Sequence, residues 1–243
     1  MARKKSVEQA GRMVILLALF MTGCEEIKDI PVIVFNPNVT YGTMTDQQGN
    51  TYKTITIGTQ VWMAENLKTA IYRNGDPVLV VTDDNQWVLK TSGAMCDYDN
   101  ESDYVPVYGR LYNWYAVNDS RNLAPAGWHV ATDNDWTLLT TFLGGESVAA
   151  KELKETGVQH WQSYSMTHNA TNSCGFTALP GGFRYEFYMN RTFWYINSYG
   201  RWWTATENDE STAWSREMCT GEDAVNRFES VKLYGYSVRC VKD

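Results

Sequence analysis

Hydrophobic and polar positions alternate over residues 52–57, a pattern typical of a β-strand with one buried face. Gly58 and Thr59 interrupt the alternation, and residues 60–63 resume it. Because a two-residue turn with glycine separates two such runs, we expect a β-hairpin here. A second hairpin is predicted where residues 78–81 and 87–89 flank a short polar sequence.

The periodicity becomes helical after Thr132. Thr132 and Asp135 have the spacing of a capping box, and Gly144 ends the pattern. A second short helix is predicted over residues 147–155, and short aromatic segments divided by glycine follow it. With helices in the middle and strands at both ends, the chain is expected to be α+β. The apolar face of the first helix comprises Trp136, Leu139, Phe142 and Leu143.

The N-terminus has the features of a secretory signal. Four basic residues precede an apolar run at residues 13–21, which is too short to span a bilayer because a spanning helix needs about 20 apolar residues. Thr22, Gly23 and Cys24 follow at once and resemble a bacterial lipobox, although Met21 stands where leucine is usual. We therefore expect a signal peptide at residues 1–23, a lipid-anchored tether at 24–44 with a diacylglyceryl-type anchor on Cys24, and one domain at 45–243.

Composition and charge narrow the class of protein. The chain has 243 residues, of which 44% are hydrophobic and 14% aromatic, so it is globular. Removal of residues 1–23 leaves 17 basic and 27 acidic residues, a formal charge of −10. Nothing in this acidic chain favours nucleic acid as a partner. Glu25 and Glu26 resemble surface-export signals, so the expected location is the outer membrane, exposed at the cell surface.

Four cysteines remain once Cys24 carries lipid, and an exported protein favours two disulfides among them. Their spacing leaves all three pairings open and does not match a zinc site. The four are Cys96, Cys174, Cys219 and Cys240.

Six segments in register carry a resemblance to a known family. The segments are 49–67 (GNTY to QVWMAENL), 109–117 (GRLYNWYAV), 124–136 (APAGWHVAT to Asp135 and Trp136), 175–182 (GFTALPGG), 202–207 (WWTATE) and 235–243 (GYSVRCVKD). Together they resemble the Fibrobacter succinogenes major paralogous domain, a family of exported proteins and lipoproteins of Bacteroidetes and Fibrobacteres. The resemblance runs from about residue 45 to the C-terminus.

This family in turn is distantly similar to the C-type-lectin-like fold, which formylglycine-generating and sulfatase-modifying domains share. The resemblance implies short twisted antiparallel sheets, two central helices and long loops. It also implies a pairing of Cys96 with Cys240 and of Cys174 with Cys219. Fold similarity does not carry function with it.

Two acidic stretches supply the oxygen ligands that calcium prefers, and we expect at most weak sites there. The loop motifs of sugar-binding C-type lectins are absent from the sequence. A structural role, with its polar atoms hydrogen-bonded, is expected for His129. The acidic candidates are Asp97, Asp99, Glu101, Asp103, Glu207 and Asp209.

Aromatic residues gather between positions 183 and 203, and we expect most of them to fill the core of the sheet. Tyrosine and tryptophan also anchor ligands and partner proteins at surfaces. We therefore expect part of this segment to form an exposed binding surface, with Arg201 as a further polar contact. The candidate ligand-binding residues are Arg184, Tyr185, Tyr188, Arg191, Trp194, Tyr195 and Trp202.

The sequence thus predicts a lipid-anchored surface binding or adhesion module whose partner is a carbohydrate or a surface protein, and which is not an enzyme. The alternatives are an enzyme of the sulfatase-modifying or glycan-processing type and a purely structural surface protein. An enzyme would need a deep pocket where titratable groups converge.

Overall fold

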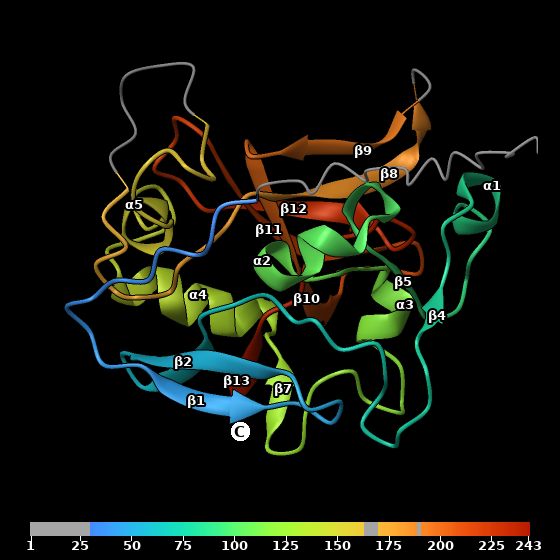
Figure 1. Cartoon of the computed structure of the whole chain (residues 1–243), viewed down its shortest axis with the longest axis horizontal. Helices are drawn as coiled ribbons and strands as arrows, with labels where there is room; N and C mark the ends of the chain where they lie inside the picture. The colour runs from blue at the N-terminus through green and yellow to red at the C-terminus, as the bar shows by residue number, and fades with distance from the viewer. Residues whose placement is uncertain (1–29, 163–169, 189–190) are drawn as a thin grey trace, which may run out of the picture.

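The alternating positions of residues 52–57 form β2 (Thr51–Ile57), which pairs antiparallel with β3 (Gln60–Met63), so the first predicted hairpin is confirmed. The computed structural model describes residues 30–162, 170–188 and 191–243, and the side chains of residues 186–188 and 191 are not described. In this part of the chain, three sheets surround a few short helices (Figure 1), which is the expected α+β class.

The first sheet joins the two ends of the domain. β13 (Cys240–Lys242) inserts between β3 and β7 (Trp128–Val130), and β1 (Gly42–Thr45) adds to β2 at the other edge. The strand order is β1-β2-β3-β13-β7. The N-terminal hairpin is therefore held by the last residues of the chain.

The second sheet has the order β12-β11-β10-β8-β9 and contains the aromatic segment. β10 and β11 pair antiparallel with Arg201 opposite Glu217, and β8 meets β10 at a parallel contact. A third, small sheet holds β4 (Leu79–Val80), β5 (Ala94–Cys96) and β6 (Leu111–Tyr112). The strands of the second sheet are β8 (Gly181–Tyr188), β9 (Arg191–Ile196), β10 (Tyr199–Glu207), β11 (Thr212–Cys219) and β12 (Asn226–Val231).

The longest helix of the described chain, α4 (Asp133–Phe142), begins with the predicted capping box. The Thr132 hydroxyl accepts from the Asp135 N–H, and Asp135 accepts from the Thr132 N–H at 2.8 Å. The prediction for Phe142 was wrong, since its ring is 65% exposed at the end of the helix. The second predicted helix is shorter than expected, because only α5 (Ala150–Leu153) is helical.

The second predicted hairpin does not form. The Asp83 side chain accepts from the Gln86 N–H at 2.9 Å and so caps a short helix, α1 (Asp84–Trp87), instead of a turn. β4 pairs with β5, in parallel. The remaining short helices are η1 (Tyr98–Asn100), η2 (Ser102–Tyr104), α2 (Val105–Tyr108) and α3 (Trp114–Val117).

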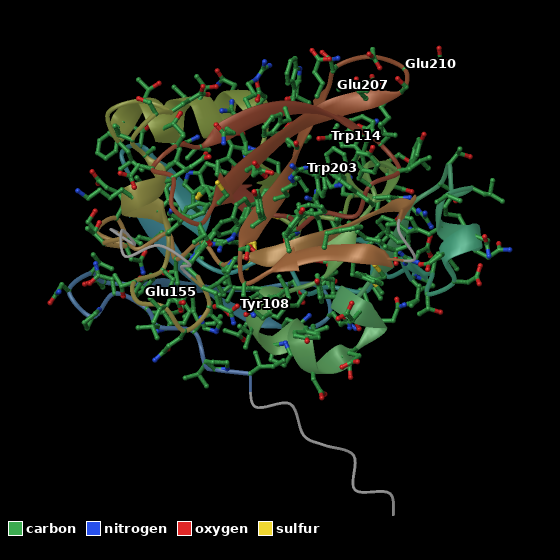
Figure 2. All side chains as sticks on the ribbon, turned by 90° about the horizontal axis from the view of Figure 1, so that it is seen from above. Tyr108, Trp114, Glu155, Trp203, Glu207 and Glu210 are labelled. Atoms are coloured by element: carbon green, nitrogen blue, oxygen red, sulfur yellow. The ribbon has the colours of Figure 1, made fainter. Side chains whose placement is uncertain are left out.

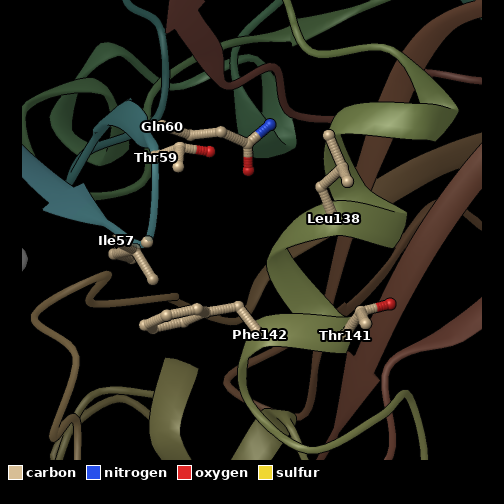
Figure 3. Close-up of a pocket in the computed structure, with 7 residues that line it drawn as sticks. Ile57, Thr59, Gln60, Leu138, Thr141 and Phe142 are labelled. Atoms are coloured by element: carbon tan, nitrogen blue, oxygen red, sulfur yellow. The ribbon is translucent and has the colours of Figure 1, made fainter.

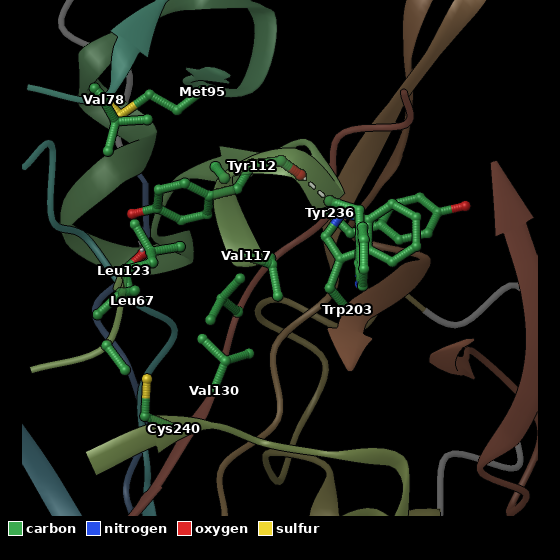
Figure 4. Close-up of a cluster of buried hydrophobic side chains, with 14 of the residues drawn as sticks. Leu67, Val78, Met95, Tyr112, Val117, Leu123, Val130, Trp203, Tyr236 and Cys240 are labelled. Atoms are coloured by element: carbon green, nitrogen blue, oxygen red, sulfur yellow. Dashed lines mark hydrogen bonds between the residues drawn. The ribbon is translucent and has the colours of Figure 1, made fainter. Parts of the chain in front are cut away.

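A central cluster of buried side chains fills the space between the sheets (Figure 4). Tyr112 from β6, Trp203 from β10 and Tyr236 meet there, and the Trp203 indole N–H donates to the Tyr112 carbonyl at 2.8 Å. Aromatic rings bury large areas and therefore dominate such a core. In the described residues, no helix is long and apolar enough to cross a membrane.

Three of the six resembling segments converge on one buried side chain, Asn66. Its Oδ1 accepts from the Trp202 indole at 2.9 Å and from Arg239 Nε at 2.7 Å. Its Nδ2 donates to the Tyr108 carbonyl at 2.8 Å. Residues of these three segments therefore hold distant parts of the scaffold together.

Candidate binding face

One side of the second sheet, at the margin of the central cluster, carries a group of partly exposed aromatic rings, which we name the aromatic face. Tyr195 is 52% exposed and Phe228 is 41% exposed, while the other rings are partly buried. Together they offer flat apolar area with hydroxyl groups at the edges, the combination that suits ligand contact. The aromatic face comprises Tyr185, Trp194, Tyr195, Tyr199, Arg201, Phe228 and Tyr234.

Strand alternation places the β10 members of the aromatic face on one side, whereas Tyr195 on β9 departs from regular alternation with a φ of 59°. Side chains two residues apart along a strand point to the same face, so Tyr199 and Arg201 lie together on β10, whereas Trp202 points the other way. Phe183 on β8 lies below them, with its ring 5.7 Å from Tyr195 and 6.4 Å from Tyr199 between centroids. The ring of Tyr195 lies 4.8 Å from that of Tyr199.

Arg201 forms the floor of the aromatic face. Its guanidinium lies 4.5 Å from the centre of the Phe183 ring and 5.5 Å from that of Phe228. It donates to the carboxylate of Glu217 and to the hydroxyls of Tyr185 and Tyr236. A planar cation between aromatic rings is held by cation–π attraction as well as by these hydrogen bonds.

The floor carries no net charge, because the Arg201 guanidinium pairs with the Glu217 carboxylate. Burial alone would lower the pKa of Arg201, but Tyr236, Tyr185 and Glu217 outweigh burial and raise it. The side chains of Arg201 and Glu217 are only 15% and 5% exposed. The ion pair is thus turned inward, and what reaches solvent is mainly aromatic.

The structure corrects two of the predicted contact residues. Arg184 and Trp202 are fully buried, so neither lies at the surface. The Arg184 guanidinium donates to the carbonyls of Val81 and Thr82, at 2.7 and 3.0 Å, and forms an ion pair with Asp84. It therefore fastens the third sheet to β8.

The other predicted contact residues fall into two groups. Tyr185, Trp194 and Tyr195 lie on the aromatic face, as does Arg201. The side chains of Tyr188 and Arg191 lie outside the described residues. The sequence pattern did not predict Phe228 and Tyr234 as part of this face. Phe228 and Val231 are the apolar residues of β12 and lie three positions apart, so no alternation marks Phe228.

The acidic stretches are not gathered into a cation site. Asp97 forms an ion pair with Arg110, and Glu207 pairs with Lys232. Asp209 accepts from the backbone N–H groups that follow it, 2.7 Å from that of Thr212, and these bonds lower its pKa to about 2. Among the described residues, no three His, Cys, Asp or Glu side chains come together as metal ligands. The candidates Asp99, Glu101 and Asp103 lie in or beside the turns η1 and η2.

His129 has the structural role expected of it. Its Nδ1 lies 2.8 Å from Asp243 and its Nε2 lies 3.1 Å from Asp135, so it bridges the C-terminus to the start of α4. Figure 2 places Glu207 and Glu210 on the side of the molecule away from Tyr108 and Glu155.

The expected disulfides are corrected as well, because all four cysteines that the structure describes are free thiols. They lie in different surroundings. Cys96 packs in the cluster of Trp87, and Cys240 lies in the central cluster. The thiol of Cys174 donates to the Glu152 carbonyl at 3.1 Å, whereas the carbonyl of Cys219 accepts from Lys154.

We predict four slowly reacting thiols. Burial raises the pKa of Cys96, Cys174 and Cys219 to about 12 and raises that of Cys240 as well, so little thiolate is present at pH 8. Titration of the Cys24→Ala variant with a thiol reagent, without reductant, should count four thiols in denaturant. In the native state these should react at least about 10-fold more slowly than a free cysteine, with the partly exposed Cys174 first. A count of zero in protein from an oxidising compartment would restore the two disulfides.

An open groove of about 610 Å³ lies between the β2–β3 turn and α4 (Figure 3). Ile57, Thr59, Leu138 and Phe142 line it, and none of its lining residues carries a charge. It therefore offers no acid or base for catalysis, and Phe142 provides an exposed ring far in sequence from the aromatic face.

The protein is an α+β domain with partly exposed aromatic rings on its second sheet. The chain belongs to the Fibrobacter succinogenes major domain family, whose sequence model matches residues 55–242, about three quarters of the chain. This confirms the family that the six segments indicated. A comparison with curated proteins and one with solved structures found no match.

Proposed function

We propose that this protein is a lipid-anchored surface module that binds glycans through the aromatic face. The observation that carries the proposal is the group of half-exposed rings over the inward-turned Arg201–Glu217 pair. A flat aromatic surface without net charge suits the apolar faces of sugar rings, and the tyrosine hydroxyls offer both donors and acceptors.

The proposal extends to the location and the fold. Lipidation of Cys24 would anchor the chain in the outer membrane, because two acyl chains give stable attachment. A C-type-lectin-like fold is supported by the resemblance of the six segments and by the pairing of β13 with the N-terminal hairpin. The alternative partner, a surface protein, would use the same rings.

The test is a glycan array probed with the full chain in a detergent without a sugar headgroup. We expect specific binding that persists in a calcium chelator, because Asp97 and Glu207 are engaged in ion pairs and Asp209 in a turn. A blank array with demonstrably folded protein would contradict the glycan proposal and favour a protein partner or a structural role. Binding lost in the chelator would restore the acidic stretches as calcium sites.

A further inference from the structure

A second hollow, which we name the Tyr108 hollow, lies away from the aromatic face. It has a volume of about 450 Å³ and lies between the end of α2, the loop after α5, the β9–β10 turn and the first described residues. Figure 2 places Tyr108 and Glu155 beside each other on this side of the molecule. The residues that line it include Pro31, Tyr104, Tyr108, Gln159, Gln162 and Asn197.

A buried ion pair lies behind one wall of the hollow. His160 and Glu155 are 0% and 1% exposed, and His160 Nδ1 lies 2.5 Å from the Glu155 carboxylate. The other ring nitrogen lies 2.9 Å from the Pro31 carbonyl, and the second Glu155 oxygen accepts from the Val34 N–H at 2.5 Å. Burial lowers the pKa of His160, but Glu155 and the Pro31 carbonyl outweigh it and raise the pKa.

This arrangement fixes the segment that follows residue 30 against the domain. Both His160 nitrogens and both Glu155 oxygens face partners in the interior, so the charges of the pair are satisfied behind the wall. A buried pair that is fully hydrogen-bonded holds a defined geometry. The hollow is therefore a preformed part of the fold.

The opposite wall is held by Asn197, in the β9–β10 turn. Its backbone has a φ of 67°, a left-handed conformation that asparagine tolerates better than most residues. Tyr108 donates its hydroxyl proton to Asn197 Oδ1 at 2.6 Å, and the Asn197 carbonyl accepts from the Gln162 N–H at 2.8 Å. The amide of Asn197 is thereby oriented, with Nδ2 remaining as a donor.

The lining is uncharged, although the protein is acidic. Two exposed glutamine amides, from Gln159 and Gln162, stand beside the Asn197 amide and the rings of Tyr104 and Tyr108. Side-chain amides both donate and accept hydrogen bonds, which matches hydroxyl groups, and tyrosine rings supply flat apolar area. No lysine or arginine lines the hollow to bind an anionic group.

We propose that the Tyr108 hollow binds a neutral saccharide through the amides of Gln159, Gln162 and Asn197. This is a site separate from the aromatic face, and it does not depend on that face binding a ligand. The glutamines select hydroxyl-bearing ligands, and the absence of basic side chains disfavours uronic acids and sulfated sugars.

The experiment is calorimetric titration of the full chain, in a detergent without a sugar headgroup, with neutral hexasaccharides of glucose and of mannose and with a hexagalacturonate. The test variant is Gln159→Ala with Gln162→Ala, and the matched control is Gln86→Ala, an exposed glutamine on α1. We expect a neutral hexasaccharide to bind, with an affinity at least 10-fold lower in the double variant and unchanged in the control.

Three results would overturn the proposal: equal affinity in the double variant, tighter binding of the hexagalacturonate, or no binding of either neutral hexasaccharide. The Tyr195→Ala variant separates this site from the aromatic face. Binding lost only in Tyr195→Ala would support the aromatic face and reject the hollow, and binding lost only in the glutamine variant would do the reverse.

Discussion

Replacement of Arg239 by alanine is expected to lower the free energy of unfolding by about 4 kcal/mol, a large part of the stability of a typical domain. Arg239 is fully buried, and its guanidinium donates to Asn66 and to the carbonyls of Met63, Phe176 and Thr177 at 2.7 to 2.9 Å. The substitution removes the Arg239 donors from the three buried carbonyls and also creates a cavity, while Asn66 still accepts from the Trp202 indole.

The expected loss of stability is large because the charged guanidinium of Arg239 is fully removed from water. Burial lowers the pKa of Arg239 to about 9, yet the group stays protonated at pH 7 and its charge is spread over four hydrogen bonds. The measurement is urea unfolding followed by tryptophan fluorescence. The matched control is Arg121→Ala, which removes a surface arginine that is 39% exposed and should lower the free energy of unfolding far less. Equal losses in the two variants would contradict the structural role of Arg239.

The aromatic face gives the second large effect. Removing the rings of Tyr195 and Phe228 together should lower glycan affinity by about 100-fold, since exposed aromatic contacts contribute about 1–2 kcal/mol each. Both rings are about half exposed, so their loss leaves the packing of Phe183 and Arg201 largely intact. Folding should therefore be preserved.

Local features of the fold were predictable from the sequence. The β2–β3 hairpin and the capping box at Thr132 depend on residues close together in the chain, and both are confirmed. The helix α1 was missed because one side-chain hydrogen bond, from the Gln86 N–H to Asp83, decided between turn and helix. Such competition between a cap and a turn is not visible in periodicity.

The candidate site was predictable only in part. The density of aromatic residues pointed to β8, β9 and β10, but alternation alone does not say which side of a strand faces the core. Both sides of β10 face buried clusters: Trp202 is fully buried on one side, and Trp203 is fully buried on the other side, which also carries Arg201. Phe228 joins the face through the antiparallel pairing of β11 with β12, two successive strands that the sequence pattern did not predict.

The family resemblance identified the scaffold better than the site. Asn66, Trp202 and Arg239 belong to the resembling segments and bond to one another in the interior. The six segments supply core positions such as Trp203 and Tyr236. They supply none of the residues that make up the aromatic face. The side chains that we propose to contact ligand come mainly from β8, β9 and β12, outside the six segments.

The most direct test of the central claim is calorimetric titration of the best glycan from the array into three proteins: the full chain, the Tyr195→Ala/Phe228→Ala variant and the control Phe142→Ala. Phe142 is 65% exposed but lies on α4, beside the groove of Figure 3. The account predicts a dissociation constant about 100-fold higher in the double variant and unchanged in Phe142→Ala. Equal affinity in the full chain and a folded double variant would show that the aromatic face is not the binding surface.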